Sequence, residues 1–138
     1  MKSRILFILI GVLAALNSCK KESCIKCHII GNWKVKETRA SFVDGNMTTE
    51  QISNYIANFL ENGKGIYKEV NSTREDSLYW SVDPSGEYVF VSLNILSDTL
   101  NRTEQFEIID SGVEKQLWRN EQITNQSILK LQWELSKI

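Results

Sequence analysis

The regular alternation of apolar and polar residues constrains the fold of this chain more than any other feature of its sequence. Within residues 129–136 every second residue is apolar, namely Leu129, Leu131, Trp133 and Leu135. Successive side chains of a β-strand point to opposite faces of a sheet, so this period of two predicts a strand with one buried face. The same period returns from Gly31 onward, among many Val, Ile and Thr residues that favour strands over helices.

Patterns of this kind predict about eight strands joined mostly by tight turns. The predicted strands cover residues 33–43, 55–60, 66–70, 78–82, 88–93, 103–109, 115–120 and 129–135. Before the second of these strands, Thr48 or Thr49 is placed to cap a short helical turn. The pair Asn62-Gly63 and the segment Asp83-Pro84-Ser85-Gly86 have the composition of tight turns.

Sequential antiparallel strands with short connections form a meander, and eight of them are enough to close into a barrel. Closure also removes the exposed strand edges that favour aggregation. The sequence therefore predicts an all-β fold, an eight-stranded antiparallel up-and-down barrel over residues 30–138. An open sandwich of two sheets is the alternative that the same pattern permits.

The N-terminal residues have the pattern of a targeting signal. Lys2 and Arg4 flank the start of an apolar run, residues 5–16, that is too short to span a bilayer but suits a secretory signal. The ending Leu16-Asn17-Ser18-Cys19 resembles the lipobox of bacterial lipoproteins, in which the peptidase cleaves before the cysteine. This resemblance implies a cleaved signal peptide over residues 1–18, a lipidated Cys19 that carries acyl chains such as palmitate, and a tether over residues 19–29.

The residue after Cys19 indicates to which membrane of the cell envelope the lipoprotein is sorted. Lys20 stands where an Asp favours retention in the inner membrane of Gram-negative bacteria. The resemblance to such lipoproteins therefore implies a lipid anchor in the cell outer membrane, on its periplasmic face or at the cell surface.

Several motifs of the folded part resemble one family of barrels. Gly31-Asn32-Trp33-Lys34-Val35 contains the Gly-x-Trp sequence that opens the first strand of lipocalin and lipocalin-like barrels. Phe59 with the following Asn62-Gly63-Lys64-Gly65, the later Leu78-x-Trp80 and the closing alternation of residues 129–135 are similar to bacterial lipocalin-like lipoproteins. The resemblance spans about residues 30–138 and implies a barrel that binds a small apolar ligand.

Aromatic residues at strand spacing are the candidates for the barrel interior. They are Trp33, Phe59, Trp80, Phe90, Phe106 and Trp133. The interior of an eight-stranded barrel is either just filled by side chains or holds one small ligand. We predict that these aromatic side chains plug the core, and a small apolar pocket at the open end is the alternative.

The tether contains Cys24-Ile25-Lys26-Cys27-His28, which matches the CxxCH pattern for covalent haem attachment. His28 is the single histidine of the chain, and Met47 is the one other candidate for an axial ligand after cleavage. We predict a local disulfide between Cys24 and Cys27 in the oxidising envelope. A c-type haem on Cys24, Cys27 and His28, or a weak zinc site on the same side chains, is the alternative. No cofactor or metal is otherwise expected.

Charge and chemistry narrow the function. After removal of residues 1–18 the chain keeps 14 of its 16 basic residues and all 17 acidic ones, a formal net charge of −3. Without a cluster of Lys and Arg, such a chain is a poor binder of nucleic acid. No nucleophile, base and orienting group form a catalytic pattern, so we expect no enzyme. We expect a monomeric binding module for a small apolar ligand, and the alternative is an envelope scaffold for protein–protein contacts.

Overall fold

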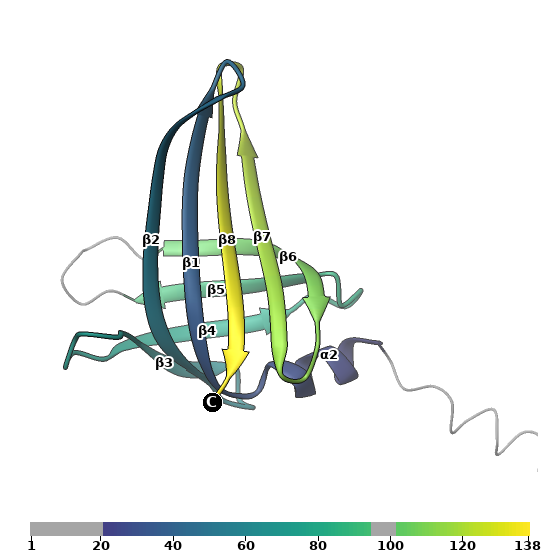
Figure 1. Ribbon diagram of the computed structural model, residues 1–138. Coiled ribbons are helices and arrows are strands. Elements are labelled where there is room, and N and C mark those ends of the chain that lie inside the picture. The colour runs from purple at the N-terminus through teal and green to yellow at the C-terminus, as the bar shows by residue number, and fades with distance from the viewer. Residues whose placement is uncertain (1–20, 95–101) are drawn as a thin grey trace, which may run out of the picture.

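The computed structural model describes residues 21–94 and 102–138, with side chains from Ile25 onward. One helix, α2 (Lys21–Ile29), precedes eight strands (Figure 1). The strands are β1 (Gly31–Val43), β2 (Asn46–Phe59), β3 (Lys64–Glu69), β4 (Asp76–Val82), β5 (Tyr88–Asn94), β6 (Arg102–Ser111), β7 (Lys115–Ile123) and β8 (Ser127–Lys137). The predicted signal peptide and Cys19 lie outside the described residues.

Each strand pairs antiparallel with the next, and β1 also pairs with β8, so the sheet closes into a barrel in up-and-down order. The predicted eight-stranded antiparallel barrel is therefore confirmed, and the open sandwich is excluded by the pairing of β1 with β8. The turn predicted at Asp83-Pro84-Ser85-Gly86 is also confirmed, because Gly86 N–H donates to the carbonyl oxygen of Asp83 at 3.0 Å.

The helical turn predicted near Thr48 is wrong, because β2 is continuous from Asn46 to Phe59. Asp44 and Gly45 both have positive φ angles, 50° and 79°, which is the conformation of a two-residue hairpin turn. This turn places β2 directly against β1, and strand pairing along β1 overrides the weak helical spacing of the sequence.

The two halves of the barrel differ in height. In Figure 1 the strands β1, β2, β7 and β8 rise together past β3–β6, which run across them. The upper part of these four strands, which we call the tall sheet, has unpaired outer edges. β2 pairs with β3 only over residues 55–59, and β6 pairs with β7 only over residues 107–111.

Helix α2 closes the base of the barrel, and residues 25 and 29 of the segment that the sequence assigns to the tether belong to the barrel core. Ile25 and Ile29 are one helical turn apart, share one face of α2, and are buried in the barrel core. The indole N–H of Trp33 donates to the carbonyl oxygen of Ile29 at 2.7 Å, as expected for a tryptophan at the closed end. Over residues 21–94 and 102–138, no helix is long and apolar enough to cross a bilayer.

Candidate functional site

Aromatic side chains fill the lower part of the barrel interior. Five of the six predicted plug residues are buried there: Trp33, Phe59, Trp80, Phe106 and Trp133. Phe90 differs from the prediction, because the buried side chains of β5 alternate with it and Phe90 lies on the outer side of the strand. Trp118 was not predicted, yet it is fully buried and its ring lies 5.9 Å from that of Trp133.

Charged side chains replace the aromatic ones towards the open end of the barrel. Glu37, only 5% exposed, accepts a hydrogen bond from Trp133 Nε1 at 2.7 Å. Its carboxylate oxygens lie 3.5 Å from guanidinium nitrogens of Arg39 and Arg102. Arg102 Nε also donates to Glu104 Oε1 at 2.6 Å. These two arginines and two glutamates, which we call the mouth cluster, balance one another in charge.

The surroundings of the mouth cluster shift the pKa of three groups. Burial acts to lower the pKa of Arg102, but the hydrogen bond to Glu104 and the charges of Glu37 and Glu104 outweigh it and raise this pKa. The rings of Tyr55 and Tyr67 lie 5.2 Å apart, and burial raises the pKa of each hydroxyl above 10.0. The arginine and both hydroxyls therefore stay protonated at neutral pH.

The mouth cluster leaves little room for a ligand inside the barrel. The void beside it measures about 10 Å³ and is lined by Arg39, Glu104, Asn120, Gln122, Leu129 and Leu131. A void of this size is at the lower limit for a single water molecule. Ligand pockets typically measure ~300–1,000 Å³, so a small apolar ligand has no matching space beside the mouth cluster.

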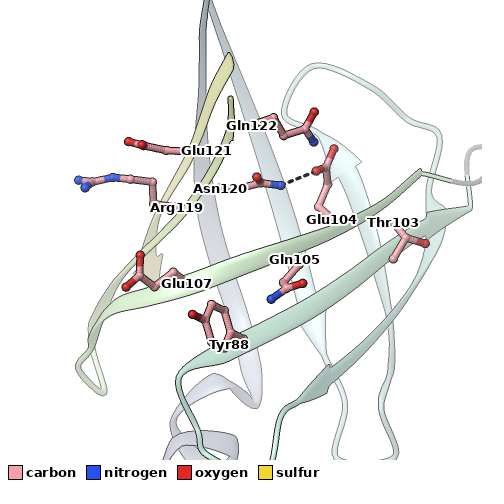
Figure 2. A pocket seen from close by; sticks show the side chains of 9 residues that line it. All are labelled: Tyr88, Thr103, Glu104, Gln105, Glu107, Arg119, Asn120, Glu121 and Gln122. Atoms are coloured by element: carbon pink, nitrogen blue, oxygen red, sulfur yellow. Dashed lines mark hydrogen bonds between the residues drawn. The ribbon is translucent and has the colours of Figure 1, made fainter. Parts of the chain in front are cut away.

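A much larger cleft, of about 630 Å³, opens between β6 and β7. Figure 2 shows its lining side chains, which are Tyr88, Thr103, Glu104, Gln105, Glu107, Arg119, Asn120, Glu121 and Gln122. Every one of them is polar, and they include three carboxylates but one guanidinium. Asn120 Nδ2 donates to Glu104 Oε2 at 2.8 Å across the gap, and Glu104 joins the β6–β7 cleft to the mouth cluster.

The β6–β7 cleft exists because the two strands separate. Pairing between them begins at Glu107 opposite Arg119 and continues only towards the base. Within residues 21–94 and 102–138, residues 102–106 of β6 have strand partners on β5 alone, and residues 120–123 of β7 have them on β8 alone. The hydrogen bond between Asn120 and Glu104 is thus a side-chain connection across a gap that no strand pairing bridges.

The CxxCH motif lies on α2 at the base of the barrel. Cys27 is an exposed free thiol, so the predicted disulfide between Cys24 and Cys27 is not formed in this structure. His28 Nδ1 donates to the carbonyl oxygen of Ser111 at 2.8 Å, since a carbonyl can only accept. Among the side chains that the structure describes, no group of three His, Cys, Asp or Glu is placed to hold a metal ion. The haem alternative stays a prediction.

Comparison with known proteins adds no family: no protein-family model matches the chain, and no curated protein matches its sequence. The likeness to lipocalin-like lipoproteins therefore stays a prediction that rests on the motifs alone, whereas the closed barrel is a property of the structure.

Sequence reasoning missed the mouth cluster and the β6–β7 cleft. A signal for Glu37 was present, because it continues the inward series Trp33 and Val35 at the same spacing. Glu104 stands likewise two residues before the inward Phe106. A polar residue at an inward position indicates a buried partner, but the sequence does not say which strand supplies it. Separation of β6 from β7 leaves no local signal at all.

Proposed function

We propose that this protein is a membrane-anchored, non-catalytic binding module of the bacterial cell envelope that binds its partner in the β6–β7 cleft. One contrast carries the proposal. The barrel interior is packed with aromatic side chains and closed by the mouth cluster. The β6–β7 cleft, in contrast, has a volume of about 630 Å³ and is lined by polar side chains. Clefts of about this volume are where proteins commonly bind ligands.

The character of the lining supports a polar partner over the small apolar ligand that the lipocalin resemblance implies. An apolar ligand gains free energy by leaving water for an apolar surface. The β6–β7 cleft offers carboxylates, amides and hydroxyls instead. Membership of the lipocalin-like lipoproteins remains part of the proposal, with the barrel serving as a rigid scaffold that positions a surface site.

The membrane anchor rests on the sequence. The basic start, the short apolar run and Cys19 after Leu16-Asn17-Ser18 support a lipidated N-terminus in the outer membrane. Two or more acyl chains hold a protein stably to a bilayer, whereas one binds reversibly. Labelling with radioactive palmitate tests this part: we expect label on the wild type and none on Cys19→Ala. An unlabelled wild type, or label that persists in Cys19→Ala, contradicts it.

Native mass spectrometry of the detergent-extracted protein tests the site. Gln105 lies on the exposed face of β6 in the cleft, so Gln105→Trp should fill the cleft without entering the core. Ser81→Trp, on the exposed face of β4, is the matched control. We expect a bound species on the wild type and on Ser81→Trp that is missing from Gln105→Trp. A bare wild type, or a species that Gln105→Trp retains, refutes binding in the cleft, and a Soret absorbance band would establish the haem alternative instead.

A further inference from the structure

We infer that the occupant of the β6–β7 cleft is an extended, basic peptide segment of another protein, which adds as a strand to the free edges of β6 and β7. The inference rests on the proposed function and names the partner class for the same cleft. Three features of the cleft lead to it: the direction of the backbone groups, the presence of two facing edges, and the charge of the lining.

The hydrogen-bond pattern of β6 shows which backbone groups point into the cleft. Ile108 N–H donates to the carbonyl oxygen of Glu87 at 2.8 Å, on the side of β5. Hydrogen-bonded and non-hydrogen-bonded pairs alternate along an antiparallel ladder, so the even-numbered residues of β6 bond to β5. The odd-numbered Thr103 and Gln105 therefore direct their N–H and C=O groups away from β5 and into the cleft.

The same reasoning applies to β7. Thr124 N–H donates to the carbonyl oxygen of Ser127 at 2.8 Å, at the turn into β8. The even-numbered residues of β7 therefore bond to β8, and the backbone groups of Glu121 and Ile123 point towards β6. Neither Glu121 nor Ile123 has a strand partner on β6 among the described residues.

Two strand edges with unused donors and acceptors thus face one gap. A row of unpaired N–H and C=O groups is a ready template for another chain, and strand addition takes its affinity from such main-chain bonds. The unpaired stretch of β6 covers residues 102–106, so an added strand of about five residues, ~16 Å long, matches it. The upper edge of β2 is also unpaired with any described strand over residues 46–53, but the described strands place no second free edge opposite it.

The charge of the lining selects the partner. Three carboxylates, of Glu104, Glu107 and Glu121, face one guanidinium, of Arg119. Glu104 is already paired with Arg102, at 2.6 Å, and Glu121 with Lys130, at 3.1 Å, whereas Glu107 forms no ion pair with any described residue. A Lys or Arg side chain of an added strand would meet the carboxylate of Glu107, and complementary charge favours the correct partner over others.

Fluorescence anisotropy with a defined probe tests the inference on the full chain extracted in detergent. The probe is a fluorescein-labelled peptide, Thr-Lys-Val-Lys-Val-Lys-Thr, and its control has Glu in place of each Lys. Gln105→Pro removes one N–H from the cleft edge of β6 but leaves the β5 ladder intact. The matched control, Ile52→Pro, removes one from the free edge of β2, where Asn54 C=O bonds outward to Val70.

We expect saturable binding of the basic peptide, a loss of about tenfold in Gln105→Pro from the missing hydrogen bond, and no more than about a twofold change in Ile52→Pro. Glu107→Gln, an exposed change that leaves the fold alone, should weaken binding about twofold to fivefold. This variant carries the test if circular dichroism shows that Gln105→Pro is unfolded.

Three results would overturn the inference. These are no saturable binding of the basic peptide up to about 1 mM, equal binding of the acidic peptide, or an affinity that neither Gln105→Pro nor Glu107→Gln lowers. If native mass spectrometry still finds a species that Gln105→Trp excludes, the proposed function stands and only the peptide class is wrong. If that species is also missing, both proposals fail.

Discussion

Replacement of Glu37 by alanine is the change that most directly tests how the barrel is closed at its open end. The variant keeps every strand but removes the one carboxylate that contacts Trp133, Arg39 and Arg102 together. We expect Glu37→Ala to be folded but markedly less stable, because it leaves a buried indole N–H without an acceptor and two arginines without this counter-charge.

The size of the loss follows from the contacts. A hydrogen bond to a charged acceptor contributes about 1.5–3 kcal/mol, and the bond to Trp133 is short at 2.7 Å. The arginine contacts are longer, at 3.5 Å, and Arg102 keeps Glu104 as a partner, so together they add about 0.2–1 kcal/mol. The free energy of unfolding should therefore fall by about 2–4 kcal/mol.

Equilibrium unfolding in urea, followed by tryptophan fluorescence, measures this loss. Glu37→Gln retains an oxygen acceptor for Trp133 and should lose about half as much as Glu37→Ala. Glu134→Ala is the control, because its ion pair with Lys36 is long at 3.9 Å and exposed, and its effect should stay within about 0.5 kcal/mol. A loss below about 1 kcal/mol in Glu37→Ala would refute the role given to this carboxylate.

Four further changes test other parts of the structure. Trp118→Ala should lower the free energy of unfolding by about 3–5 kcal/mol in the same urea assay, since its side chain is fully buried; a loss of 1 kcal/mol or less would show an interior more adaptable than described. Ile29→Ala should lower it by about 2–5 kcal/mol if α2 is part of the core, and leave it unchanged if this segment is a loose tether. Burial raises the pKa of Tyr55 and Tyr67 above the 10.0 of an unperturbed tyrosine. Their contribution to the free energy of unfolding is therefore full below pH 10 and is lost as the pH rises through the folded-state pKa values. Urea titrations across this range should show that loss in the wild type, and a smaller one when both are phenylalanine. Iodoacetamide without reductant should modify Cys27, which is an exposed free thiol; a mass two hydrogens lower with no adduct would show the disulfide instead.

The sequence was sufficient to predict the barrel because its signals are local. Strands with one buried face alternate visibly, and the turns at Asn62-Gly63 and Asp83-Pro84-Ser85-Gly86 mark where the chain reverses. Where alternation is hidden, prediction failed. Nearly every residue of 88–93 is apolar, so Phe90 could not be assigned to a face, and Trp118 follows Leu117 directly, which conceals its inward position.

Helix α2 and the candidate site were missed for a different reason. The nine residues of α2 are mostly polar, and only the contact of Ile25 and Ile29 with the barrel base makes the helix part of the core. Glu37 and Trp133 are 96 residues apart, and they meet only because β1 pairs with β8. The β6–β7 cleft likewise depends on where two strands stop pairing, which is decided by the closure of the whole sheet.

The packing of α2 against the base of the barrel also decides how the protein would be oriented on a membrane. If Cys19 carries the lipid, a single residue separates Cys19 from the start of α2. The barrel would then have almost no freedom to move away from the membrane surface. It would stand with its base on the bilayer while the 13 residues of β1, at ~3.3 Å each, lift the hairpin tips roughly 40 Å above it. The binding surface of the barrel would then lie at a fixed height above the bilayer, and only a partner at that height would reach it. A longer linker before residue 21 should relax this restriction on height without altering the barrel.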